Sequence, residues 1–181
     1  METTWRPAAE SLVRDLRTVF GDRLRSVVVY GRHLDGAVDA PLTCLALVTG
    51  LSASDLDGCA SLAPRWQRDR IAVPLILPEE EFRRSLDAFP LEYGEIIRAH
   101  ERVHGNDPFE GVTIARDDLR RACETQIKSH LVHLREGYIS AGAHPGRVAE
   151  MVTASAAAFA ALLRSVARLA GLEVRDRAEA T

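Results

Sequence analysis

The stretch Arg25-Ser-Val-Val-Val-Tyr-Gly-Arg32 decides the fold, together with a second apolar run over residues 42–48. The valine-rich run that ends at Tyr30 predicts a β-strand, and Gly31 marks the turn that closes it. A spacer of roughly ten residues leads to the second run, which predicts another strand. The chain is therefore expected to begin its sheet as strand, glycine turn, spacer and strand.

Further elements are predicted on both sides of these strands. We expect helices over residues 8–20, 52–68 and 79–88, and a third strand over residues 71–77. Ser52 or Ser54 can cap the second helix. Pro74 places the third strand at a sheet edge, because proline cannot donate a ladder hydrogen bond. Residues 91–104 fit either a helix or a strand.

From Arg116 onward the pattern predicts two long helices. Apolar residues of the first recur every three or four positions, at Leu119, Cys123, Ile127, Leu131, Leu134 and Tyr138. A break at residues 142–146 leads to a second helix over residues 147–169. Its residues 154–161 are almost all small, which permits close approach of another helix. We therefore expect an α/β domain over 1–115, a helical region over 116–172 and a polar tail over 173–181.

Composition limits the classes of protein that the chain can belong to. A formal net charge of −3 gives no strong nucleic-acid signal. Three scattered cysteines, an odd number without metal-binding spacing, indicate free thiols in a reducing compartment. The longest uncharged stretch, residues 151–163, is shorter than the roughly 20 residues that a membrane span needs. We expect a soluble cytoplasmic protein with no membrane segment.

The strand, glycine turn and strand order resembles the entry to a polymerase-β-type nucleotidyltransferase site, of the minimal or kanamycin type. The resemblance implies an α+β fold, with a small mixed sheet flanked by helices and followed by a helical hairpin. In that family a Gly-Ser turn binds phosphates, and two carboxylates at i and i+2 on the second strand bind Mg²⁺. A third carboxylate on a following strand activates the attacking hydroxyl.

This sequence departs from the family at each chemical position. Only Gly31 matches; Arg32 replaces the serine, Leu42 and Cys44 stand for the two metal carboxylates, and the third falls at about Pro74. None of these three side chains offers the oxygen ligand that Mg²⁺ requires. The resemblance thus implies a non-catalytic nucleotide-binding or assembly module with no metal or cofactor, in which Gly31 and Arg32 contact phosphate. An active Mg²⁺-dependent nucleotidyltransferase with displaced ligands is the first alternative.

Other acids could provide displaced ligands. Ser54-Asp-Leu-Asp57 spells the family's metal motif, but no apolar strand follows it, so we interpret Asp55 and Asp57 as the acidic first turn of a helix. Asp35 and Asp39 lie in the spacer, where acids are usually just solvated.

Histidines give the second alternative. Residues 100–104 read His-Glu-Arg-Val-His, a zinc-hydrolase signature if it lies on a helix. Arg98 and Arg102 interrupt the apolar setting that such a helix usually has. His130 and His133 are expected to be exposed helix residues. The small-residue surface of the last helix favours a homodimer through the C-terminal helices, with a nucleotide as a second partner.

Overall fold

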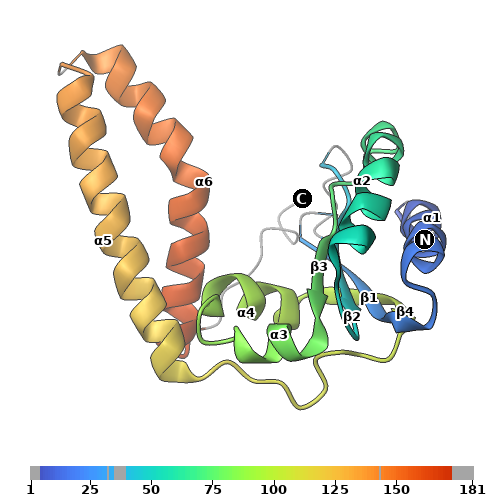
Figure 1. Cartoon of the computed structure of the whole chain (residues 1–181). Coiled ribbons are helices and arrows are strands. Elements are labelled where there is room, and N and C mark those ends of the chain that lie inside the picture. Colours follow the sequence, from blue (N-terminus) through green and yellow to red (C-terminus); the bar gives the residue numbers. More distant parts are fainter. Residues whose placement is uncertain (1–4, 32, 35–39, 143, 173–181) are drawn as a thin grey trace, which may run out of the picture. The chain divides into compact units, whose positions relative to one another are not determined.

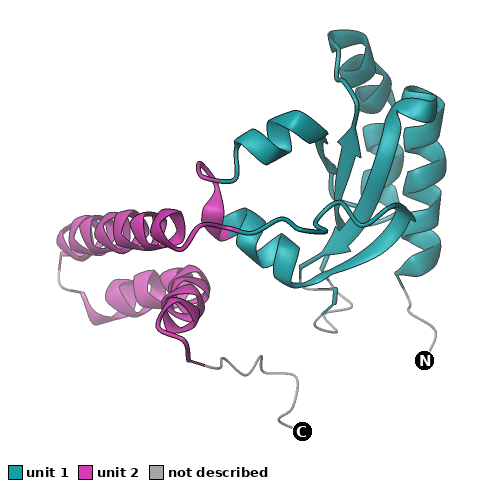
Figure 2. Ribbon diagram, turned by 90° about the horizontal axis from the view of Figure 1, so that it is seen from below, with its two compact units in different colours: residues 1–86, 92–113 teal, residues 87–91, 114–181 magenta. Residues whose placement is uncertain are grey.

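A computed structural model describes residues 5–31, 33–34, 40–142 and 144–172 of the 181-residue chain. It forms two compact units (Figure 2). Unit 1 comprises residues 1–86 and 92–113, and unit 2 comprises residues 87–91 and 114–181. Strands pair in the first unit and long helices pair in the second, so the α+β class expected from the sequence is confirmed.

Unit 1 is built on a four-stranded mixed sheet with the order β3-β2-β1-β4 (Figure 1). Its strands are β1 (Leu24–Tyr30), β2 (Thr43–Val48), β3 (Leu75–Pro78) and β4 (His100–Gly105). β1 pairs antiparallel with β2 and with β4, whereas β2 and β3 are parallel. The predicted edge position of the third strand is confirmed. Pro74 lies just before β3, between that ladder and an isolated bridge that joins Leu42 to Ile71.

Two helices supply the main core of unit 1. These are α1 (Arg6–Phe20) and α2 (Ala53–Arg68), and a short 3-10 helix, η1 (Gly21–Arg23), leads from α1 into β1. Their apolar side chains pack on alternate residues of β1 and β2, as the period of a strand requires. A buried carboxylate links the helices. Asp15 accepts hydrogen bonds from Trp66 Nε1 and Arg65 Nη1, both at 3.0 Å.

A smaller aromatic cluster lies elsewhere in unit 1. The Phe82 ring of α3 (Glu79–Arg84) lies 4.9 Å from the ring of Tyr93, in α4 (Pro90–Arg98), and 5.6 Å from that of Phe109. The stretch 91–104, which fits either type of element, is thus both: α4 occupies most of it and β4 begins at His100.

Unit 2 contains α5 (Arg116–Ser140) and α6 (Pro145–Leu169), each of 25 residues. The helices run antiparallel, because His130 of α5 meets Phe159 of α6 and Gly137 lies against Met151 nearer the connecting turn. The two predicted long helices are confirmed. Within them only Cys123, Leu162 and Ser165 are fully buried, so a helix pair by itself leaves most of its apolar residues partly in contact with solvent.

Candidate functional site

The turn after β1 is where a nucleotidyltransferase-like site would lie. Gly31 has a φ of 80°, and a Cβ at this position would lie 3.0 Å from Thr43 Oγ1. Thr43 Oγ1 donates a hydrogen bond to the carbonyl oxygen of Tyr30 at 2.5 Å, which ties the end of β1 to the start of β2. Neither strand end carries an acid.

The spacer residues that bear on this site lie outside the described residues. They are Arg32, Asp35 and Asp39. Phosphate binding by Gly31 and Arg32 therefore stays a prediction.

The structure corrects which residues stand at the metal positions. Leu42 and Cys44 are 2% and 1% exposed, and both belong to the core beneath α1 and α2. Burial raises the pKa of the Cys44 thiol to about 12. A carboxylate at either of these two positions would point into the core, since successive residues of a strand face opposite sides of the sheet. The opposite side of β2 carries Thr43 and Leu45, so the assignment from sequence is wrong by one residue, yet both sets lack a carboxylate.

The Ser54-Asp-Leu-Asp57 motif lies at the start of α2, where Asp55 is in the first turn, as the sequence indicates, and Asp57 follows that turn. Asp55 is 5% exposed and forms a capping box with Ser52, which identifies Ser52 as the N-cap residue. Arg23 Nη2 and Nη1 donate to the two carboxylate oxygens of Asp55 at 2.6 and 2.8 Å. Hydrogen bonds from Arg23 and then Ser52 hold the pKa of Asp55 well below its usual range. Both oxygens of the Asp55 carboxylate therefore already accept hydrogen bonds from other residues of the protein.

The zinc-hydrolase alternative is wrong, because residues 100–104 form β4 and not a helix. Four strand residues span roughly 13 Å, so His100 and His104 are too far apart to share a tetrahedral ion. His100 is also engaged within unit 1: Nδ1 lies 3.1 Å from the carbonyl oxygen of Ile97, and Nε2 lies 3.4 Å from Asp107 Oδ1. Among the described residues, no group of three or more His, Cys, Asp or Glu side chains could hold a metal.

An exposed apolar surface of unit 2 lies along one side of the helix pair; Val132 and Ile139 of α5 are exposed as well, on the side turned away from α6. We call it the hairpin face and define it by three residues of each helix: Ile127, Leu131 and Tyr138 of α5, and Val152, Phe159 and Leu163 of α6. Each of the six is 42–53% exposed. The sequence predicts the α5 row as part of one apolar stripe. In the structure only Cys123 of that stripe is fully buried, and the hairpin-face residues lie at its solvent-exposed edge.

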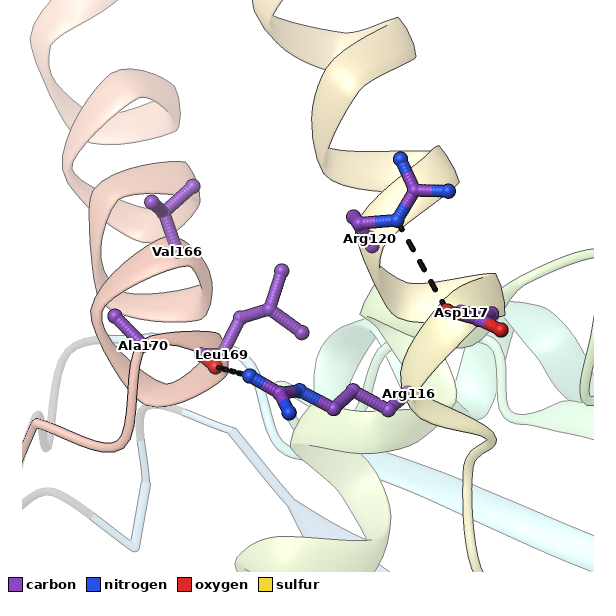
Figure 3. Close-up of a pocket in the computed structure, with 6 residues that line it drawn as sticks. All are labelled: Arg116, Asp117, Arg120, Val166, Leu169 and Ala170. Atoms are coloured by element: carbon purple, nitrogen blue, oxygen red, sulfur yellow. Dashed lines mark hydrogen bonds and ion pairs between the residues drawn. The ribbon is translucent and has the colours of Figure 1, made fainter.

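A cavity of about 380 Å³ lies at the open end of the hairpin, lined by Arg116, Asp117, Arg120, Val166, Leu169 and Ala170 (Figure 3). Arg116 Nη2 donates to the carbonyl oxygen of Leu169, the last residue of α6, at 3.0 Å. Arg120 Nε lies 4.0 Å from Asp117 Oδ1, and its guanidinium also bonds Glu124. The charged groups that line this cavity thus bond to other residues of the same hairpin. The cavity follows from how the two helices are held together, and we do not assign it to a ligand.

Helix α6 also has the length and composition of a membrane span, alone among the helices in the described part of the chain. This is weak evidence, because its charged residues, Arg147, Glu150, Arg164 and Arg168, all fall on one side of the helix. One-sided charge is the pattern of a helix that packs in a bundle or lies at a surface.

Comparisons with known proteins establish no family for this chain. No protein-family model matches the chain, and no curated protein does. One similar solved structure is a complex of tri-AMPylated Shewanella oneidensis HEPN toxin with MNT antitoxin; the alignment has 11% identity and a TM-score of 0.39, and covers 68% of this chain and 91% of the other. A toxin–antitoxin structure with AMP-PNP aligns at 14% identity and a TM-score of 0.38, over 75% and 98% of the two chains. A mutant MntA-HpeT toxin–antitoxin gives the same identity and coverage, with a TM-score of 0.37.

At these identities and scores the likeness transfers no residue role and no activity to this chain.

Proposed function

We propose that this chain is a non-catalytic assembly module: a nucleotidyltransferase-like unit without metal carboxylates, joined to a helical hairpin that mediates association, in the first instance as a homodimer. The observation that supports it is the start of β2. Leu42 and Cys44 are core residues, Thr43 is bonded to the end of β1, and no acid occupies either side of the strand there. A transferase of this type needs oxygen ligands at that place to hold Mg²⁺ and the triphosphate.

The displaced-ligand alternative has little chemistry available among the described residues. Asp55 is bonded to Arg23 and Ser52, and Asp57 is an exposed residue of the same helix. Positions i and i+2 on a helix point roughly 200° apart, so the two acids cannot clamp one ion. What the chain does offer is an apolar helical surface, which suits binding to another protein.

The test is turnover. Purified protein is incubated with Mg²⁺ and each of the four nucleoside triphosphates, and pyrophosphate release and nucleotide transfer are followed, with added pyrophosphate as the detection control. We expect neither signal, and no difference between wild type and Asp55→Ala. Steady pyrophosphate release that disappears in Asp55→Ala or Asp57→Ala would establish the active transferase instead.

Nucleotide binding without turnover is a separate question. If the turn after β1 keeps an anion site, Gly31 would contribute its backbone amide and Arg32 its guanidinium. Calorimetric titration with a nucleoside triphosphate would then give weak binding that is reduced in Arg32→Ala. Equal titrations for the two proteins would remove Arg32 from the site.

A further inference from the structure

We infer that the hairpin face binds the hairpin face of a second copy of this chain, so that two hairpins form a four-helix bundle with each α5 against the partner's α6. This inference rests on the proposed assembly function. It specifies which surface associates, that the partner is a second copy of the chain, and how the two hairpins are arranged.

The first step is that both rows of the hairpin face lie on the same side of the helix pair. Successive helix residues are about 100° apart. In α5 the side toward α6 is centred near His130 and Gly137, and Ile127, Leu131 and Tyr138 lie about 60–120° further round. In α6 the same rotation from Met151 reaches Val152, Phe159 and Leu163. Because the helices are antiparallel, equal rotations turn both rows to one side.

The second step concerns the rest of α6. Its charged residues, Arg147, Glu150, Arg164 and Arg168, all fall on the side opposite the hairpin face. Next to the face on the outer side come only small residues: Ala149, Ala156, Ala160 and Ala167. The half of α6 that includes the hairpin face therefore carries no charge and little bulk, and another helix can approach it closely.

The expected small-residue surface over 154–161 is accordingly not one face. Ala156 and Ala160 adjoin the hairpin face, because Ala156 lies one turn from Val152 and two turns from Leu163. Ala157 lies between Glu150 and Arg164, each seven residues away, in a row that includes charged side chains. These neighbouring alanines are a matched pair for testing the surface.

The third step is the occupant. The six side chains of the hairpin face are each 42–53% exposed, and a contiguous exposed apolar patch of this kind marks a site of contact with another protein. A stable interface buries about 800 Å² on each partner, so the adjoining alanines must belong to the contact as well. Two helices cannot enclose a core between them alone, whereas two such pairs face to face make a four-helix bundle.

The two edges of the hairpin face also fit each other. The outer edge of α5 carries long charged side chains, Glu124, Lys128 and Arg135, while the outer edge of α6 carries alanines. A two-fold axis parallel to the helices places each α5 edge over the partner's alanine edge, so the aliphatic stems cover small residues and no like charges meet. All neighbouring helices are then antiparallel, as in an up-and-down bundle.

The experiment compares Ala156→Arg with Ala157→Arg by sedimentation equilibrium on the full chain, with circular dichroism and urea unfolding to verify that both fold. Both alanines are exposed. Wild type and Ala157→Arg should be dimers of the 19.9 kDa chain at micromolar concentration. Ala156→Arg should raise the dimer dissociation constant at least about 100-fold, because it buries an unpaired charge in the interface.

Arrangement is tested by oxidising the double variant Leu131→Cys with Ala156→Cys. These positions lie at the same level on facing helices of the two copies, whereas within one hairpin they are on separate helices that point the same way. A disulfide-linked dimer is expected from the double variant and from neither single variant; the three native cysteines are buried. Cross-linking by either single variant alone would overturn the arrangement.

A monomeric wild type, or a dimer that both arginine variants leave unchanged, would overturn the inference. Binding of a monomeric wild type to phosphatidylserine vesicles, lost in Ala156→Arg, would assign the hairpin face to a membrane surface. Each of these outcomes is separate from the proposed absence of catalysis, which pyrophosphate release or nucleotide transfer would contradict.

Discussion

Arg23 and Asp55 are joined by two hydrogen bonds, from Nη1 to Oδ2 at 2.8 Å and from Nη2 to Oδ1 at 2.6 Å. The pair connects the residue before β1 with the first turn of α2, where Ser52 adds its hydroxyl and backbone N–H to the same carboxylate. An acid that could have served a metal site instead fixes the helix that covers the sheet.

This pair predicts an acid-sensitive contribution to stability. The bonds from Arg23, and then from Ser52, favour the ionised form and lower the pKa of Asp55 in the folded state. Such a group stabilises the fold fully above its unfolded pKa of about 3.9, and the contribution is lost as pH falls toward the folded value. Urea unfolding of Asp55→Asn should therefore show lower stability than wild type at pH 7 and a flatter dependence below pH ~4.

The matched control is Asp57→Asn, two residues along in the same helix and exposed. Because this side chain is exposed, the stability of Asp57→Asn at pH 7 should stay close to that of wild type. Parallel pH curves for wild type and Asp55→Asn would mean that Arg23 does not stabilise the carboxylate in solution.

The orientation of β2 predicts opposite outcomes for neighbouring acids. Cys44→Asp places a carboxylate in a fully buried apolar site and should cost more than about 4 kcal/mol or prevent folding. Thr43 is half-buried, so Thr43→Asp should lose little beyond the hydrogen bond to Tyr30, about 1 kcal/mol. Denaturant unfolding measures both, and a Thr43→Asp variant that is less stable than Cys44→Asp would reverse the assignment of the two strand faces.

The strands and helices could be predicted because each follows from a local pattern. Valine runs, the Ser52 cap, the glycine after α1 and the three-to-four spacing of α5 are visible in the sequence and do not depend on the rest of the fold. The face of β2 could not be predicted. Residues 42–48 are apolar or small on both sides of the strand, so no alternation shows which side meets α1 and α2, and a slip of one residue exchanges Cys44 for Thr43.

The histidine motif at residues 100–104 also shows that a local pattern can mislead, because long-range pairing decided its structure. Residues 100–104 match a helical signature letter for letter, but pairing with β1 over Ser26–Tyr30 makes them a strand. That pairing joins residues 70 to 79 positions apart in the chain, which no short motif records. For the hairpin face, the period identified the α5 stripe. The choice between Ala156 and Ala157 required the position of Met151 against Gly137, together with the buried Leu162 and Ser165, which fix the side of α6 that meets α5.

A close approach of β1 and β4 predicts a strong glycine requirement. Gly105 has a φ of 74°, and a Cβ there would lie 1.8 Å from the carbonyl oxygen of Arg25. Gly111 has a similar φ of 72° but nothing within 4 Å of its Cβ position. Both alanine variants bear the left-handed cost of about 1–2 kcal/mol. Gly105→Ala should lose at least about 2 kcal/mol more, because the strands must separate. Equal losses of stability for Gly105→Ala and Gly111→Ala in urea unfolding would mean that β4 can move away from β1 without a loss of free energy.

The last prediction concerns the open end of the hairpin. The final carbonyl groups of a helix lack partners within it, and a cation near that end interacts favourably with the helix dipole. Arg116 supplies both for α6 through its 3.0 Å bond to the carbonyl oxygen of Leu169. Arg116→Ala should therefore cost about 0.5–1 kcal/mol and speed amide exchange in the last turn of α6, while exchange near the connecting turn stays unchanged. Arg121→Ala is the control, since the bond that Arg121 makes in the described part of the chain is to Asp118 of its own helix. Faster exchange in α6 for both variants, or for neither, would show that Arg116 does not hold this helix end.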